Sequence, residues 1–375
     1  MVPRCGRARE HAKEEFAGAY LNLPRFGPFW RSFRMSGTIA KIALAGRGHR
    51  RSRSDSARTA SIGGSAVGHA LAAAAPPPAT PYDPAMFATL LGALPRPTEA
   101  DDDLDSAIEL VVRAQEEAGL EPISDGRLRA ADGRRRAAAP AELPTPAAAV
   151  DAWRSTQAIT DRAVKQALPG PFSLGADLAL ADGLGEVAAA LAEAGCPLVE
   201  FEESGLERLG DESERRRFHH LHERLLERVT GTHLSLSIVG ATPDPDAWAT
   251  VLALPYASLA VDLIAGPDSW NLVTRLAGER GVVAGVESAR ETDEPKEVLL
   301  WAAHYAASTQ GRGMARVGLG SAGSWANLAW ETAVRKMRLL GEAARLATMP
   351  AGDELIRSMD PRAVSPRHAA LGHDV

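Results

Sequence analysis

Cysteine is scarce in this chain. Its 375 residues include 2 cysteines, Cys5 and Cys196, which lie far apart in unlike sequence contexts. Such a pair excludes both a disulfide framework and a cage of thiolates around a metal ion. Low cysteine use of this kind fits a reducing compartment, so we expect a cytoplasmic protein.

Long hydrophobic runs are also missing, because charge, glycine or proline interrupts every stretch of Ala, Leu and Val. A helix that spans a bilayer needs about 20 consecutive apolar residues, which argues against a membrane protein. Hydrophobic residues make up 45% of the chain and charged residues 24%, as in a soluble globular protein with an ordinary core. The length allows one large domain or two smaller ones.

The first 84 residues differ from the rest in charge and in pattern. They hold 13 Lys/Arg and 5 Asp/Glu and show no sustained periodicity, which predicts a disordered basic leader. Arg50 and Arg51 loosely resemble a twin-arginine export signal, and the arginine-rich stretch could contact nucleic acid, but it lacks interleaved aromatic residues. The interpretation we favour is a dispensable tail, or a segment upstream of a true start at Met35 or Met86. We expect no nucleic-acid partner, and we expect residues 350–375 to form a C-terminal tail.

Between residues 85 and 349, short β-branched or apolar runs alternate with longer segments of helical period. Eight strands are expected, at residues 87–91, 122–124, 163–168, 198–202, 229–236, 258–264, 281–286 and 315–319. Helices are expected at residues 103–118, 185–194, 211–227, 270–280, 295–308 and 325–347. This alternation predicts a single α/β domain folded as a (β/α)8 TIM barrel. An open doubly wound sheet is the competing fold, although no glycine-rich dinucleotide turn follows the first strand.

A barrel carries its chemistry at the carboxyl ends of its strands, so polar residues at the expected strand ends are the candidate site. These residues are Gly92, Asp125, Arg127, Glu202, Glu203, His233, Ser235, Asp262, Glu287 and Ser321. Loops are polar in any case, which weakens the signal of each residue taken alone.

Taken in order, these strand ends resemble the catalytic barrel of the cobalamin-independent methionine synthase family. Leu91 to Pro95 is similar to the family's Ile-Gly-Ser-Phe-Pro, Glu200 to Leu206 to its Gln-Ile-Asp-Glu-Pro-Ala-Leu, and Thr232 to Ser235 to its Thr-His-x-Cys. The family binds zinc through a His, two Cys and a Glu, and uses it to activate a thiol that accepts a methyl group from a folate. Here the matching positions hold His233, Ser235, Asp262 and Ser321, so the resemblance implies a zinc site without its thiolates.

The resemblance also implies roles for the other strand ends. Gly92, Arg127 and Glu203 match substrate-binding positions, and Arg127 replaces a glutamate, a charge reversal that favours a carboxylate or phosphate. His233, Glu287 and Glu202 match catalytic positions. Glu287 stands where the family has a proton-donating histidine, and a carboxylic acid can do that work only if its pKa is raised.

The expected function is therefore a methyltransferase-like enzyme acting on a small molecule, with a folate-type donor and a degenerate zinc site. Two alternatives stay open: a metal-free barrel enzyme that resembles the related uroporphyrinogen decarboxylases and acts on a carboxylate substrate, and a barrel that binds a ligand without turnover. The oligomeric state is not indicated by the sequence. Three histidines on residues 211–227, His219, His220 and His222, match no metal-binding spacing and are interpreted as a solvated helix face.

Overall fold

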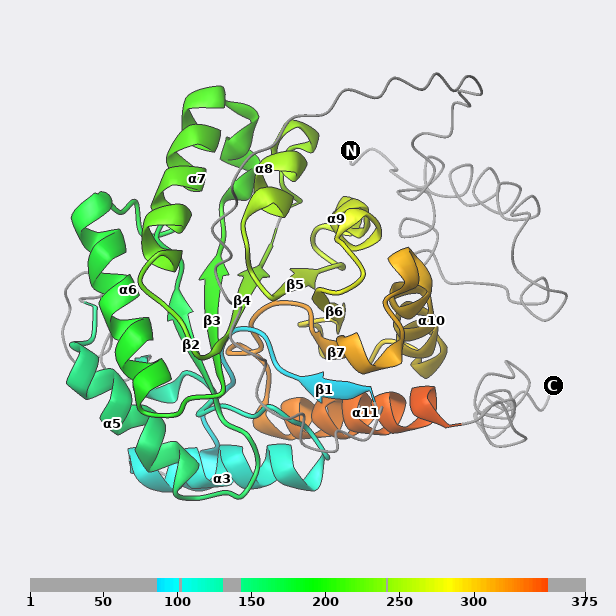
Figure 1. The fold of residues 1–375 in the computed structure, drawn as a ribbon. Coiled ribbons are helices and arrows are strands. Elements are labelled where there is room, and N and C mark those ends of the chain that lie inside the picture. Colours follow the sequence, from blue (N-terminus) through cyan, green and yellow to red (C-terminus); the bar gives the residue numbers. More distant parts are fainter. Residues whose placement is uncertain (1–85, 101–102, 131–142, 241, 350–375) are drawn as a thin grey trace, which may run out of the picture.

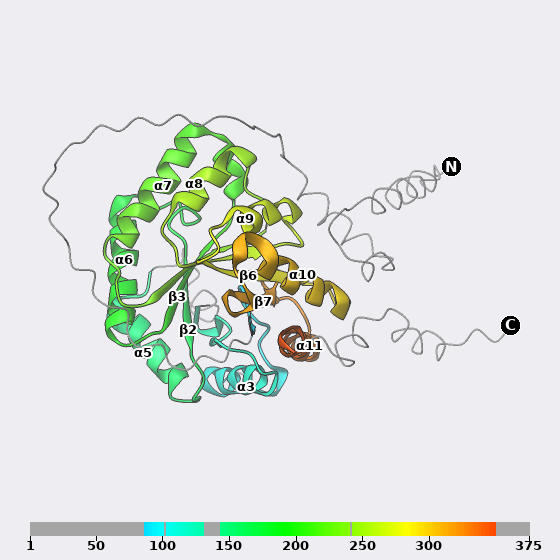
Figure 2. The same ribbon diagram turned by 45° about the vertical axis from the view of Figure 1, so that its right-hand side comes forward.

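The computed structural model describes residues 86–100, 103–130, 143–240 and 242–349. Within them, one curled parallel sheet is covered on its outer side by helices, as Figure 1 and the turned view in Figure 2 show. The expected leader of residues 1–84 and the expected tail of residues 350–375 lie outside the described residues. None of the helices in the described ranges is long and apolar enough to cross a membrane.

Strands and helices alternate along the chain. The strands are β1 (Phe87–Thr89), β2 (Lys165–Pro169), β3 (Leu198–Glu203), β4 (His233–Ile238), β5 (Ser258–Asp262), β6 (Gly281–Glu287) and β7 (Val317–Ser321). The helices are α3 (Leu104–Glu117), α5 (Pro146–Gln157), α6 (Leu178–Glu193), α7 (Glu212–Leu226), α8 (Trp248–Ala253), α9 (Trp270–Arg275), α10 (Lys296–Ser308) and α11 (Trp330–Thr348). The expected helices at residues 103–118, 211–227 and 295–308 are confirmed almost to the residue, whereas α5 and α8 were not foreseen.

The sheet has seven parallel strands in the order β1-β7-β6-β5-β4-β3-β2. This order runs around the sheet without the reversal that defines a doubly wound sheet, so the competing fold is wrong. The parallel α/β architecture expected of a barrel is present. One of the eight expected strands, at residues 122–124, is not a strand in the described part of the chain.

Residues 121–124 nevertheless link the two edges of the sheet. Glu121 N donates to Ala88 O at 2.8 Å, Ile123 N donates to Ala163 O at 2.9 Å, and Lys165 N donates to Ile123 O at 2.9 Å. Ile123 forms a single parallel bridge with Val164. Proline has no N–H and cannot donate to a ladder, so Pro122 limits this segment to isolated hydrogen bonds.

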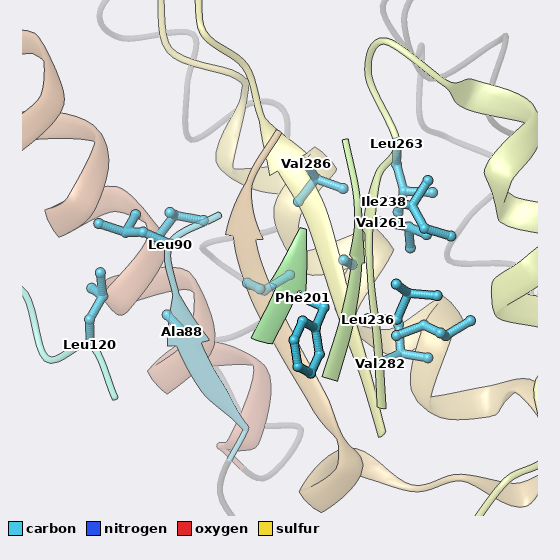
Figure 3. Packing of buried hydrophobic residues seen from close by; sticks show 14 of the residues in the cluster. Ala88, Leu90, Leu120, Phe201, Leu236, Ile238, Val261, Leu263, Val282 and Val286 are labelled. Atoms are coloured by element: carbon cyan, nitrogen blue, oxygen red, sulfur yellow. The ribbon is translucent and has the colours of Figure 1, made fainter. Parts of the chain in front are cut away.

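Strand side chains alternate between two faces, and the outward face is apolar. Outward residues from five strands join one large hydrophobic cluster with the helices: Val199, Phe201, Leu234, Leu236, Ile238, Leu259, Val261, Val282, Ala284, Val286, Val317 and Leu319. Figure 3 shows several of them packed between sheet and helices. Burial of this surface against the helices stabilises the curled sheet.

The inner face of the sheet is divided into an apolar part and a polar part. Leu91, Ala260 and Val283 form a small cluster with Phe87 on the apolar part. Gly320 of β7 makes room for it, because a side chain there would begin only 2.9 Å from Val283. The polar part, on β2 to β5, holds the buried residues Lys165, Glu200, Ser235, Ser237 and Ser258.

Gly341 lies where α11 packs closely against the end of its neighbour α3. A Cβ at Gly341 would overlap the carbonyl oxygen of Ala118, the C-cap of α3, whereas a Cβ at Gly183 within α6 meets no atom within 4 Å. We expect Gly341→Ala to lower the free energy of unfolding by about 1–3 kcal/mol, as overpacking does. The matched change Gly183→Ala should raise it by about 0.5–1 kcal/mol through helix propensity. Urea unfolding followed by circular dichroism measures both, and equal effects of the two changes would contradict the close packing of α3 and α11.

Candidate functional site

The structure places several of the predicted site residues at the carboxyl end of the sheet. Glu202 and Glu203 end β3, Asp262 ends β5, Glu287 ends β6 and Ser321 ends β7. Gly92 and Arg127 lie in the segments that follow β1 and the linking residues 121–124. Parallel strands end at a common edge, so these residues share one end of the molecule.

His233 does not belong to this group. It is the first residue of β4 and lies in register with Leu198, the first residue of β3, so its expected place at a carboxyl strand end is wrong. In the β4–β5 register Ile238 is level with Val261, so Asp262 lies about six residues further along than His233, roughly 20 Å at 3.3 Å per residue. His233 instead contacts Ser258 at the amino end, with 2.8 Å between Nε2 and Oγ.

Ser235 also lies short of the carboxyl end, because it is the third residue of β4 and is level with Glu200. The expected strand at residues 229–236 was placed too early. Leu234, Leu236 and Ile238 alternate with polar residues, and this period continues two residues past the expected end. The true strand end is Ile238, where no histidine or cysteine stands.

Ser321 and Gly92 have close partners within the protein. The Ser321 hydroxyl accepts from Leu91 N at 2.7 Å and donates to Leu91 O at 2.9 Å, and so joins β7 to the residues after β1. Gly92 has φ +76°, and a Cβ there would lie 2.8 Å from the Cα of Ser324. A substrate therefore has limited room at either residue.

Arg127 and Glu202 form an ion pair at the carboxyl end, with 2.6 Å between Nη1 and Oε2. Both side chains are largely buried, at 14% and 17% exposure. Arg127 has φ +59°, a left-handed conformation that is costly outside glycine, and its N–H donates to Asp125 Oδ1 at 2.8 Å. Strained residues of this kind concentrate at functional sites.

Glu203 points away from Glu202, as neighbouring residues of a strand must. Its carboxylate accepts from Phe172 N at 2.9 Å and Ser173 N at 2.7 Å, and so holds the loop after β2. On its other side Oε1 lies 3.0 Å from His222 Nε2, and His222 Nδ1 lies 2.7 Å from the Tyr256 hydroxyl. The structure thus places Glu203 in the helical layer rather than beside Glu202.

His222 is fully buried in that layer, so the interpretation of all three α7 histidines as a solvated face is wrong for this one. His219 does lie at the surface, 3.1 Å from Glu223. The signal that could have distinguished His222 is its spacing: it is four residues from Phe218 and three from Leu225, on the apolar stripe of the helix.

Glu287 is buried and pairs with Lys336 of α11. Burial raises the pKa of Glu287 to about 7, against the opposing effect of Lys336. The raised pKa is the property expected of an acid that donates a proton. Glu287 accepts hydrogen bonds from Lys336 of α11 and, at 3.2 Å, from the N–H of Glu294, in the segment before α10.

Asp262 is held by backbone groups. Oδ1 accepts from Ile264 N at 3.0 Å and Ala265 N at 2.8 Å, and Oδ2 accepts from Gly240 N at 3.4 Å. Burial raises the pKa of Asp262 in spite of these donors. Asp262 therefore lies between the loops that follow β4 and β5, and it is the one predicted metal ligand with a carboxylate at the carboxyl end.

Two charged residues on the inner face were not foreseen. Lys165 Nζ lies 3.0 Å from Glu200 Oε1 and donates to Leu90 O at 2.7 Å, and the two side chains are 2% and 3% exposed. Glu200 lies two residues before Glu202 on the same face of β3. A lysine within an expected strand was the available signal, since buried lysines need a partner.

The predicted metal ligands do not fit a single zinc ion. His233 and Ser235 are separated along the strands from Asp262 and Ser321, and Ser321 already exchanges two hydrogen bonds with Leu91. Among the residues that the structure describes, no three His, Cys, Asp or Glu side chains group in a way that could hold a metal. Cys196 precedes β3 at the amino end, away from the predicted ligands at the carboxyl end, and burial raises the pKa of its thiol to about 11.

Comparison with solved structures shows a fold shared with barrel enzymes. A B12-independent methionine synthase from Shewanella sp. W3-18-1, in complex with selenomethionine, is 15% identical with a TM-score of 0.58, over 69% of this chain and 97% of that one. A protein from Listeria monocytogenes assigned as a vitamin B12-independent methionine synthase is 14% identical with a TM-score of 0.54, over the same shares. No family model and no curated protein matches the chain. At this identity the likeness concerns the fold alone.

The separation of His233 from Asp262 generates a prediction about zinc. We expect protein equilibrated with zinc and then desalted to retain far less than one ion per chain, because one ion cannot reach ligands roughly 20 Å apart. The His233→Ala variant should retain the same amount. Inductively coupled plasma mass spectrometry measures both, and near-stoichiometric zinc that disappears in the variant would contradict the placement of His233.

The buried Glu287 generates a prediction about pH. Its folded pKa of about 7 lies above the ordinary value of 4.5, so its contribution to stability is present below pH 4.5 and is lost as the pH rises through 7. Between pH 5 and 8, the wild type should lose at most about 3 kcal/mol of unfolding free energy relative to Glu287→Gln. Chemical unfolding of both proteins across that range tests this. A wild type that gains stability relative to the variant would mean that the Lys336 ion pair outweighs burial.

Proposed function

We propose that this chain is a methyltransferase-like barrel enzyme that binds a small carboxylate-bearing molecule at the carboxyl end of its strands. The Arg127–Glu202 ion pair is the observation that carries the proposal. A strained, largely buried arginine at this end of a parallel α/β sheet fits a binding residue better than a surface charge.

Arg127 has donors to spare for a ligand. A guanidinium carries five N–H groups in a planar fork, and within the described residues Arg127 uses its Nη1 for Glu202. The edge formed by Nε and Nη2 has the geometry that binds a carboxylate through two parallel hydrogen bonds. Glu202 offsets the charge of Arg127 before the ligand arrives, which lowers the cost of keeping a cation in a largely buried place.

Transfer of a methyl group is the finer part of the proposal. It is supported by the resemblance of the strand ends to the methionine synthase family and by a fold like that of two such structures. A folate-type donor and a thiol acceptor would follow from the same resemblance. The four residues expected to hold zinc do not fit it, so we route no step through a metal.

A second candidate is a metal-free lyase or decarboxylase that acts on a carboxylate substrate. The replacement of the family's glutamate by Arg127 favours it, as does the separation of the expected metal ligands. Methionine formed from homocysteine and 5-methyltetrahydrofolate would identify the transferase, and mass spectrometry of the products decides. A ligand that stabilises the protein while no product forms would indicate a binding protein instead.

Arg127 can be tested with small carboxylates such as methionine and pyruvate by calorimetric titration. We expect Arg127→Met to weaken binding about 10- to 100-fold, because about 1.5–3 kcal/mol of charge-assisted hydrogen bonding is lost. Arg127→Lys should restore part of it, since a lysine keeps the charge without the fork.

Arg113 supplies the matched control, because its ion pair with Glu116 has a distance of 2.8 Å but lies on α3 at the surface. Arg113→Met should bind as the wild type does. Equal binding by the wild type and by Arg127→Met would refute the proposed carboxylate site.

A further inference from the structure

We propose that Lys165 forms a covalent imine with a small 2-oxo acid whose carboxylate is held by Arg127. This inference rests on the carboxylate site proposed above. It adds a nucleophile to that site and names the ligand class as a molecule with a carbonyl group next to its carboxylate.

Lys165 is oriented toward the carboxyl half of the sheet. Its backbone starts β2, but its Nζ donates to the carbonyl of Leu90, which follows the last residue of β1. The amine therefore lies on the inner face, beside Glu200 and below the end of β1. An amine in a low-dielectric place with an adjacent base is the arrangement that makes lysine a nucleophile toward carbonyl carbon.

The spacing of Glu200 and Glu202 relates the amine to Arg127. These two glutamates are two residues apart on the same face of β3, which separates them by about 6–7 Å along the strand. Arg127 contacts Glu202, which is nearer the carboxyl end of β3, and Lys165 contacts Glu200. In the proposed complex a ligand carboxylate binds the guanidinium at about 2.8 Å, and the next carbon of the ligand points along this face of β3 toward the amine. A 2-oxo acid has its carbonyl at that carbon.

Glu200 supplies the proton transfers that imine formation needs. The Lys165 ammonium gives one proton to the Glu200 carboxylate, and the free amine attacks the carbonyl carbon, so a C–N bond forms and the oxygen takes the electron pair. Glu200 returns that proton to the oxygen, takes one from the nitrogen and passes it to the resulting hydroxyl, so that the C–O bond breaks and water leaves. The balance is amine plus ketone giving imine plus water, without an oxidant or reductant. Burial raises the pKa of Glu200, which suits it to hold a proton between these steps.

The other lysines in the described ranges provide internal controls. Lys336 is equally buried, but it contacts Glu287 and donates to Thr292 O at 2.7 Å in the helical layer. Lys296 is more exposed and lies 2.7 Å from Glu342. The described contacts of Lys336 and Lys296 are with residues other than Arg127 and its partner Glu202. Selective reaction of Lys165 would therefore reflect its site rather than lysine chemistry in general.

The experiment is reductive trapping on the full chain. The protein is incubated with pyruvate and sodium cyanoborohydride, and the expected product carries the mass of one pyruvic acid less one oxygen atom, mapped by peptide sequencing to Lys165. Lys165→Arg, which keeps the charge, should give no adduct at that position, whereas Lys336→Arg should react as the wild type does. Glu200→Gln should slow trapping about 100-fold.

Arg127→Met separates this inference from the proposed carboxylate site. It should slow trapping with pyruvate about tenfold and leave trapping with acetone, which has no carboxylate, unchanged. Pyruvate that binds in calorimetry without an adduct at Lys165 would overturn the imine and leave the carboxylate site standing. Adduct at Lys165 that is insensitive to Arg127→Met would support the imine and refute the carboxylate site. Adduct confined to other lysines or to the chain terminus would overturn the inference.

Discussion

The alternation of side chains along parallel strands is the constraint on which this molecule depends. On β3 it sends Val199 and Phe201 into the helical layer and keeps Glu200 and Glu202 on the inner face. A shift of one residue would exchange these sets, burying two carboxylates among apolar side chains and removing the partners of Lys165 and Arg127. The apolar packing that holds the helices on the sheet thus also fixes the register that brings the charged residues together.

Much of the fold follows from local pattern. The periodic helices α3, α7 and α10 and the strands β3, β5 and β6 could be placed from sequence, because hydrophobic period and end signals agree there. Two failures have local causes. Pro122 weakens a short apolar segment that otherwise suggests a strand, and the expected strand at residues 229–236 stops before the alternation of β4, which extends to Ile238, is complete. Because of the second failure, His233 was expected at the carboxyl end of the sheet, whereas it lies at the amino end.

The candidate site was harder to foresee, because its pairs join distant parts of the chain. Arg127 and Glu202 are 75 residues apart, and so are Lys165 and Leu90. Local pattern could nominate Arg127 and Glu202 separately as strand-end residues, but it could not pair them. Alternation along β3 sends Glu202 and Glu203 to opposite faces, but it does not say which residues each one meets, because that depends on the register that neighbouring strands set. Resemblance to a family carried the same weakness, because it assigned His233 a place that the strand register contradicts.

The charges at this end of the sheet limit which ligands can bind. Lys165 offsets Glu200 and Arg127 offsets Glu202, whereas the described partners of Asp262 are backbone N–H groups. A ligand carboxylate on the free edge of Arg127 comes close to Glu202, and two carboxylates on one guanidinium repel each other at low dielectric. A ligand that also carries a donor or a cationic group relieves that repulsion. A protonated imine of Lys165 keeps beside Glu200 the positive charge that the ammonium already supplies, so covalent attachment preserves the Lys165–Glu200 charge balance.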